Sequence, residues 1–193
     1  MNTKAKAVAV STVGYMCLAI SGWMIQMSDA SWFSRQYGTA ILYPLAIILA
    51  VMGILSFVQN RGLDSIVFFG GAGLLGSVAA YFPAHAFVGA MEPRAYIGWF
   101  ACLWAIFFLY VWAGSFKSGV PRMLFLLALW LSLGAIAIGD WAGLNGWIIA
   151  GGYLGLISSV LAFVTSGSEI IRYGHAANPN MEVTGTARPM AAD

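Results

Sequence analysis

Charge is the scarcest feature of this sequence. Nine Lys or Arg and seven Asp or Glu make up only 8 % of 193 residues, whereas about 25 % is usual for a soluble domain. The sequence also has only two histidines and two cysteines, and no glycine-rich phosphate loop followed by Lys and Ser or Thr. We therefore expect no enzyme, no catalytic residues, no metal and no cofactor. A net charge of +2 gives no indication of nucleic-acid binding.

The few charges divide the chain into six long uncharged stretches. They cover residues 7–28, 36–60, 65–91, 95–116, 123–139 and 141–168. A membrane-spanning helix needs about 20 predominantly apolar residues, and a barrel strand about half that number. The sequence therefore predicts an all-α membrane protein, a six-helix transmembrane domain over residues 1–174 followed by a disordered cytoplasmic tail over 175–193. We expect spans at about 7–27, 40–58, 65–81, 95–114, 121–139 and 146–165.

Lys and Arg are distributed unequally between the two sides of such a bundle. One side would carry both termini and the even-numbered loops, with Lys4, Lys6, Arg61, Lys117, Arg122, Arg172 and Arg188. The other side would carry only Arg35 and Arg94. The positive-inside rule therefore predicts a multi-pass protein of the inner (plasma) membrane with both termini in the cytoplasm and the lipid bilayer as a partner.

The third predicted span is rich in glycine. It contains Gly70, Gly71, Gly73 and Gly76, and those that are three residues apart are expected to lie on one helical face. Small residues at this spacing favour close packing of membrane helices. Pro83 is expected to end the helix.

No Asp, Glu, Lys, Arg or His lies deep inside any predicted span. Pumps and ion-coupled carriers normally keep such residues in the membrane, so we expect downhill movement of any solute. Hydroxyls such as those of Ser21 and Ser132 could line a path, although a Ser in a spanning helix often bonds the backbone carbonyl one turn earlier. Asp140 and Glu169 lie at span ends, either as solvated helix-end residues or as mouth charges that select the solute.

Short motifs follow one another in the second half of the chain. They are Tyr96-Ile97-Gly98, Leu103-Trp104, Gly114-Ser115-Phe116-Lys117, Ala137-Ile138-Gly139-Asp140 and Gly151-Gly152-Tyr153-Leu154-Gly155-Leu156, then Ala162 and Glu169. In these motifs and their spacing, residues 95–174 resemble the acetate uptake transporters, also called succinate-acetate permeases. The first half is less similar.

The first predicted span departs from the family pattern. Members usually begin it with Asn-Pro-Ala-Pro-Leu-Gly-Leu, where this chain has Ala9-Val10-Ser11-Thr12-Val13-Gly14-Tyr15. Leu18 stands where the family tends to place a pore-narrowing Phe, and Ala72 or Gly73 where it tends to place a Tyr. Leu129 matches the family's Leu, and Ser21 replaces a Thr.

The resemblance implies a ring-like homo-hexamer with a solute path through each protomer. Its function would be channel-like or facilitative transport of acetate or another small monocarboxylate, a small organic acid. The candidate path residues are Leu18, Ser21, Ala72, Gly73, Leu129 and Ser132.

Two other functions remain open at this point. A channel for urea or a short amide would have acidic and aromatic residues at its mouths, as in Asp140-Trp141. A structural or accessory subunit of a larger membrane complex could dispense with the Asn-Pro-Ala-Pro start. It would bind its partner through Trp99, Tyr110 and Trp112.

Overall fold

Six helices account for almost all of the described chain. A computed structural model describes residues 3–30, 32, 39–88 and 94–177. The helices are α1 (Thr3–Asp29), α2 (Thr39–Val58), α3 (Gly62–Val88), α4 (Arg94–Gly114), α5 (Val120–Ala142) and α6 (Asn145–Ala177). Each is long and apolar enough to cross a membrane, and no strand occurs in these ranges. The prediction of an all-α, six-helix, multi-pass membrane protein is therefore confirmed.

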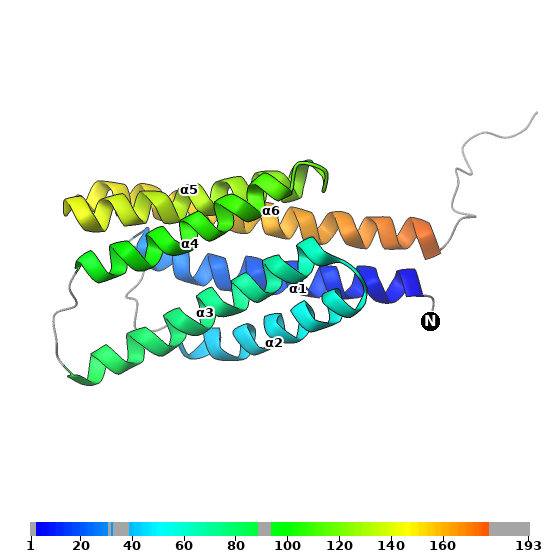
Figure 1. The fold of residues 1–193 in the computed structure, drawn as a ribbon, viewed down its shortest axis with the longest axis horizontal. Helices are drawn as coiled ribbons and strands as arrows, with labels where there is room; N and C mark the ends of the chain where they lie inside the picture. Colours follow the sequence, from blue (N-terminus) through cyan, green and yellow to red (C-terminus); the bar gives the residue numbers. More distant parts are fainter. Residues whose placement is uncertain (1–2, 31, 33–38, 89–93, 178–193) are drawn as a thin grey trace, which may run out of the picture.

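The helices form a ring in chain order. Each packs against the next, and α6 returns to pack extensively against α1. The start of α1, the α2–α3 and α4–α5 turns and the end of α6 lie at the same end of the bundle (Figure 1). We call this the terminal end. The opposite end, where α5 turns into α6, is called the far end.

Large side chains fill the centre of the bundle. The side chains buried at 2 % exposure or less include Tyr15, Leu42, Leu49, Phe68, Phe108 and Leu126, which come from α1 to α5. Tyr15 meets Phe68 and Phe125 edge to face, with ring centroids 5.2 and 5.9 Å apart, a favourable aromatic geometry. The interior is therefore packed around rings from α1, α3 and α5.

The four α3 glycines do not all lie on one face, although Gly70 and Gly73, three residues apart, both face α4. A Cβ on Gly70 or Gly73 would meet Phe107 or Trp104 of α4, whereas one on Gly71 would meet Leu18 of α1. The glycines admit bulky side chains from two neighbours. Each of these bulky side chains fills a gap between two helices whose backbones are not in contact at that point.

Pro83 does not end α3, which continues to Val88, and Pro44 lies inside α2. A proline removes one backbone donor but leaves the rest of the helical bonding intact. Inside a membrane no water is available to hydrogen-bond the backbone groups that unwinding would expose. A spanning helix therefore tolerates proline better than a soluble one does.

The closest backbone approaches involve α6. A Cβ on Gly152 would lie 2.5 Å from the Ala30 nitrogen, and one on Gly151 would lie 2.9 Å from the Ser132 carbonyl oxygen. Glycine is therefore required where α6 meets the end of α1 and the middle of α5. This small-residue contact is the membrane packing that the sequence led us to expect on α3.

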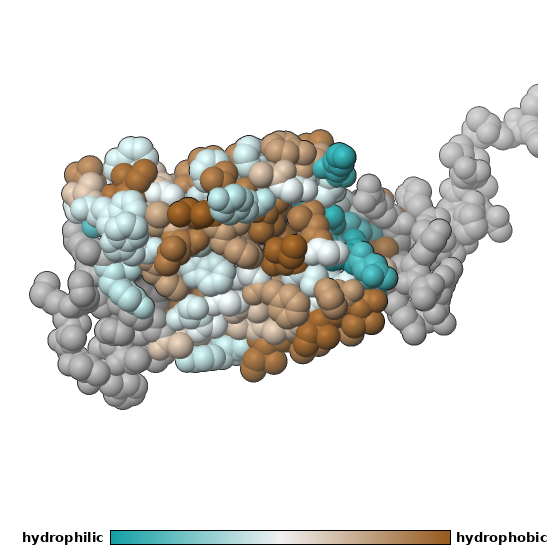
Figure 2. All heavy atoms as spheres, in the orientation of Figure 1, coloured by the Kyte–Doolittle hydropathy of each residue, from teal (hydrophilic) through white to brown (hydrophobic). Residues whose placement is uncertain are grey.

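The outside of the bundle is apolar along its length. Phe57, Val58 and Leu103 are exposed, as is Tyr110. Figure 2 shows apolar residues along the flank and a group of hydrophilic residues at the terminal end. This distribution suits a protein whose flanks meet lipid tails.

We predict that Gly152→Ala destabilises the bundle by about 1–3 kcal/mol, because the new methyl group would overlap fixed backbone. Gly167→Ala in the same helix is the matched control, since a Cβ there meets nothing within 4 Å. Thermal unfolding in detergent measures both. Equal midpoints for the two variants would contradict the close approach of α1 and α6.

Candidate functional site

Leu18 lies at a tight contact between α1 and α3. Its side chain is 9 % exposed, and its Cδ2 would be 2.5 Å from a Cβ on Gly71. The residue that receives Leu18 is thus Gly71, next to the predicted Ala72. A single methyl group at position 71 would force Leu18 or α3 to move.

Of the other predicted narrowing residues, two pack against the core cluster that contains Leu18, and one faces α4. Ala72 and Leu129 are half-buried and pack against the same core cluster as Leu18. Gly73 instead faces Trp104 of α4, whose Cη2 would lie 2.9 Å from its Cβ. The structure therefore gathers Leu18, Ala72 and Leu129 in one cluster and places Gly73 on a different side of α3.

The two predicted polar contacts are both engaged with backbone. Ser21 donates to the carbonyl oxygens of Cys17 at 2.7 Å and Leu18 at 3.2 Å. Ser132 donates to the Gly151 carbonyl oxygen at 2.7 Å and so joins α5 to α6. Because a hydroxyl has one proton to donate, neither can give a hydrogen bond to a carboxylate without first releasing its present acceptor.

The terminal end of the bundle holds a buried carboxylate. Asp64, in the first turn of α3, is 2 % exposed. It accepts hydrogen bonds from the Tyr15 hydroxyl at 3.0 Å and the Ser11 hydroxyl at 3.3 Å. It also pairs with Arg61 at 2.9 Å and Arg122 at 3.4 Å. A buried charge is tolerated only when it is paired and hydrogen-bonded in this way.

Glu169 of α6 completes the group. Its Oε1 lies 3.1 Å from Nη2 of Arg122 and 3.8 Å from Nη2 of Arg61. The Arg122 guanidinium also lies over the Tyr15 ring, 5.2 Å from its centroid, at a cation–π distance. We call Arg61, Asp64, Arg122 and Glu169 the ionic cluster. It joins α3, α5 and α6, and Tyr15 links it to α1.

Local backbone geometry places both arginines. Asn60 adopts a left-handed conformation, with φ of 59°, which Asn tolerates better than most residues. The resulting tight turn sets Arg61 just before α3, from where its Nη1 also donates to the Ala7 carbonyl oxygen at 2.6 Å. Gly119, with φ of 103°, precedes α5 and brings Arg122 into the first turn of that helix.

The sequence argument missed the ionic cluster. The sequence led us to treat Arg61 and Arg122 as cytoplasmic loop charges, Asp64 as a charge between spans, and Glu169 as either a solvated helix-end residue or a mouth charge. The structure buries Asp64 and Glu169, at 2 % and 5 % exposure. A signal was present, because the predicted topology already placed these residues at one end of the bundle.

Asp140 lies in the last turn of α5, at the far end, and is 6 % exposed. It is therefore buried and not solvated, and it is separated from Glu169 by the length of the bundle (Figure 1). Its neighbour Trp141 is partly exposed and packs edge to face on Trp99, with centroids 4.9 Å apart.

Within the described ranges, no group of three or more His, Cys, Asp or Glu could hold a metal ion.

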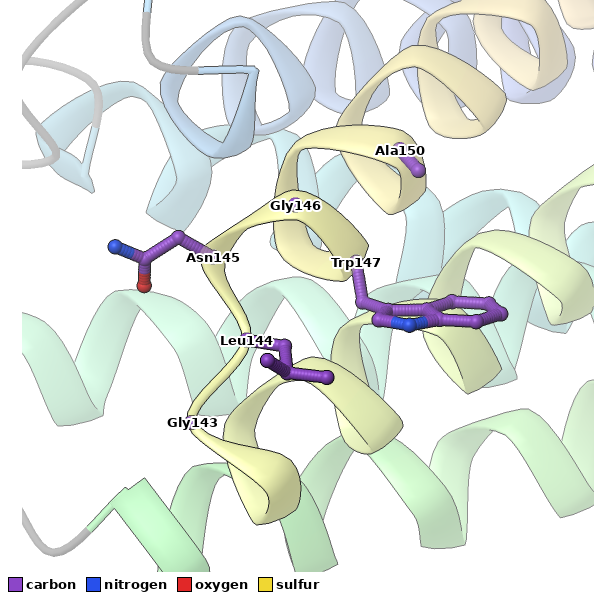
Figure 3. Close-up of a pocket in the computed structure, with 6 residues that line it drawn as sticks. All are labelled: Gly143, Leu144, Asn145, Gly146, Trp147 and Ala150. Atoms are coloured by element: carbon purple, nitrogen blue, oxygen red, sulfur yellow. The ribbon is translucent and has the colours of Figure 1, made fainter.

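An open hollow of about 490 Å³ lies at the far end, where α5 turns into α6. Its lining residues are Gly143, Leu144, Asn145, Gly146, Trp147 and Ala150. Figure 3 shows the Leu144 and Trp147 side chains on one side of the turn and the Asn145 amide directed away from them. None of the predicted path residues lines this hollow, so it is not the narrowing.

A solved structure described as that of the bacterial acetate channel SatP matches this chain with a TM-score of 0.77. The match covers 92 % of this chain and 97 % of that chain at 17 % sequence identity. The chain has the fold of SatP. No protein-family model and no curated protein matches the sequence. The SatP similarity extends over nearly all of both chains, and it confirms the six-helix bundle that the resemblance implied.

We predict that Tyr15→Phe destabilises the protein by about 1–3 kcal/mol, because the buried Asp64 carboxylate loses a donor that water cannot replace. Tyr43→Phe is the control, since Tyr43 is 46 % exposed. Asp64→Asn should cost more, about 3–5 kcal/mol, because it leaves two partly buried arginines short of a partner. Denaturation in detergent tests the order of the three variants. A Tyr15→Phe protein as stable as Tyr43→Phe would show that the hydroxyl contributes nothing.

Proposed function

We propose that this protein is a channel-like or facilitative transporter of acetate or another small monocarboxylate, and a divergent member of the acetate uptake transporter family. The observation that carries the proposal is the SatP fold, shared over 92 % of the chain. The sequence motifs of residues 95–174 support it independently.

The proposed path crosses the centre of the bundle between α1, α3 and α5. Its narrowest part is formed by Leu18, Ala72 and Leu129, together with Gly71. Because Leu18 fills the space beside Gly71, a solute passes only when this side chain moves. An apolar constriction of this kind can gate by excluding water, and it suits a solute no larger than a short acid.

The position of the buried charges supports downhill movement. Asp64 and Arg122 lie in first helical turns, Asp140 in a last turn, and Glu169 close to the terminal end of α6. The narrowing between them is lined by apolar and hydroxyl groups. A relay of ionisable groups across the membrane, as in a proton pump, would need a buried charge there.

We further propose a ring-like homo-hexamer in the inner membrane, with the terminal end facing the cytoplasm. Exposed apolar residues on α2 and α4, such as Ile47, Phe57 and Leu103, offer surface for lipid or a second copy. The alternative accessory role loses part of its motivation, because Trp112 is half-buried against Trp130, with centroids 6.0 Å apart. It does not share an outer face with Tyr110.

We predict that purified protein in liposomes takes up labelled acetate above the rate of empty liposomes. Leu18→Ala should raise the rate several-fold by widening the constriction, and Ala72→Trp should lower it at least about tenfold, equivalent to 1.4 kcal/mol. Leu103→Ala is the control for loss of an exposed leucine. Uptake equal to that of empty liposomes, unchanged by both path variants, would refute transport. Swelling in urea that exceeds swelling in acetate would indicate an amide channel.

Topology gives a separate prediction. A reporter fused after Arg188 should read out as cytoplasmic, and one inserted beside Glu92 as external. An external C-terminal fusion would reverse the proposed orientation.

Mild-detergent purification should yield a homo-oligomer, whereas stoichiometric co-purification of an unrelated subunit would favour the accessory role.

A further inference from the structure

We propose that Arg122 is a binding site for the carboxylate group of the solute at the terminal end of the path, and that Glu169 occupies this site when no solute is bound. The inference rests on the proposed transport of a small monocarboxylate. It adds a specific charged residue to a path that is otherwise apolar.

The Arg122 guanidinium does not use all of its hydrogen-bond donors. One nitrogen, Nη2, serves both carboxylates, with Glu169 Oε1 at 3.1 Å and Asp64 Oδ1 at 3.4 Å. Its Nε is buried and has no hydrogen-bond partner among the described residues. Charge-assisted bonds of this type are usually about 2.7–2.9 Å long, and an Arg–carboxylate pair is often bidentate. Arg122 therefore retains an unused donor beside a shared one.

A free carboxylate can use that donor. The Nε and Nη atoms of a guanidinium present two parallel N–H groups, which match the two oxygens of a carboxylate. Once Glu169 has moved away, a small acid such as acetate could bind along this edge without the restraint that attachment to α6 places on Glu169. The acid would thus gain a bidentate contact that Glu169 does not make.

To keep the ionic cluster neutral, the carboxylate of the solute must replace one of the two carboxylates of the protein. The two arginines and two carboxylates of the ionic cluster sum to zero, so a third carboxylate would leave the buried group negative. Asp64 is held by four partners, the two arginines, Tyr15 and Ser11. Glu169 is the carboxylate that exchanges, because its contact with Arg61 is the longer one, at 3.8 Å against 2.9 Å for Asp64.

The site lies directly above the narrowing. Arg122 covers the Tyr15 ring, and Tyr15 is one helical turn before Leu18 on the same face of α1. Arg61, on the outer side of the cluster, is 24 % exposed, against 12 % for Arg122. A carboxylate arriving from water at the terminal end would therefore pass Arg61, bind Arg122 and then meet the apolar constriction.

Binding can be observed at the predicted atom, independently of transport. The sequence has six arginines, so protein labelled with ¹⁵N-arginine gives few Nε–H signals in an NMR spectrum, and Arg122→Lys assigns the one from Arg122. Sodium acetate should shift this signal saturably, and sodium chloride at equal ionic strength should not. Glu169→Gln should lower the acetate concentration at half-saturation about tenfold, because the internal competitor is gone.

Transport kinetics provide the second readout. Glu169→Gln should lower the half-saturating acetate concentration for uptake, whereas Arg122→Lys should raise it about tenfold by replacing the planar fork with a point charge. The double variant should behave like Arg122→Lys, since Glu169 competes only for the guanidinium. Lys117→Gln removes a cation from the α4–α5 turn at the same end and should leave the half-saturating concentration unchanged.

The outcomes separate the two proposals. An acetate-specific shift of the Arg122 signal in a protein that carries no acetate would support the site and refute the transport function. Acetate uptake with an Arg122 signal that moves alike in acetate and chloride would support transport and overturn the site. Equal effects of Lys117→Gln and Arg122→Lys on uptake would also overturn it, by showing a general electrostatic effect.

Discussion

The Asp64 carboxylate is the group on which the terminal end of the bundle depends. It is 2 % exposed, so its charge must be balanced by protein groups and not by water. Those groups come from different parts of the chain: Ser11 and Tyr15 from α1, Arg61 from the α2–α3 turn and Arg122 from α5. Removing an arginine would leave a buried, unbalanced charge, and removing a hydroxyl would leave the carboxylate short of a hydrogen-bond donor, which makes the contact between these elements cooperative.

The apolar centre of the bundle follows from this arrangement. Because Tyr15 is oriented by its bond to Asp64, its ring is fixed against Phe68 and Phe125. These rings lie beside Leu18, and Leu18 occupies the space that Gly71 leaves open. A displacement of the charged groups would therefore be transmitted to the proposed constriction through rigid aromatic side chains and not through the backbone.

The far end is built differently. There α6 approaches α1 and α5 through Gly152 and Gly151 at distances that leave no space for a methyl group. Close backbone packing is rigid, since any motion would cause overlap. The bundle thus combines a far end held by close backbone packing with a terminal end held by ionic contacts. This arrangement would suit the proposed path if it opens from the terminal end.

The number of helices was determined by the sequence itself, because membrane lipid imposes a minimum apolar length and excludes charge from the middle of each span. Their lengths were not, since α3 and α6 extend well beyond the predicted spans 65–81 and 146–165. The motifs of residues 95–174 were likewise enough to predict a fold that the SatP match then confirmed. These are properties of consecutive residues, and a linear pattern can express them.

The direction of each side chain was decided only in the tertiary structure. Glycines spaced for one face of α3 turned to α1 and α4, because the neighbouring helices offered Leu18, Trp104 and Phe107 to fill the gaps. The ionic cluster could not be seen in the sequence as a cluster, since Asp64, Arg122 and Glu169 are far apart along the chain and each resembles an ordinary helix-end charge. Burial of those charges depends on their mutual compensation, and compensation exists only once α3, α5 and α6 are packed together.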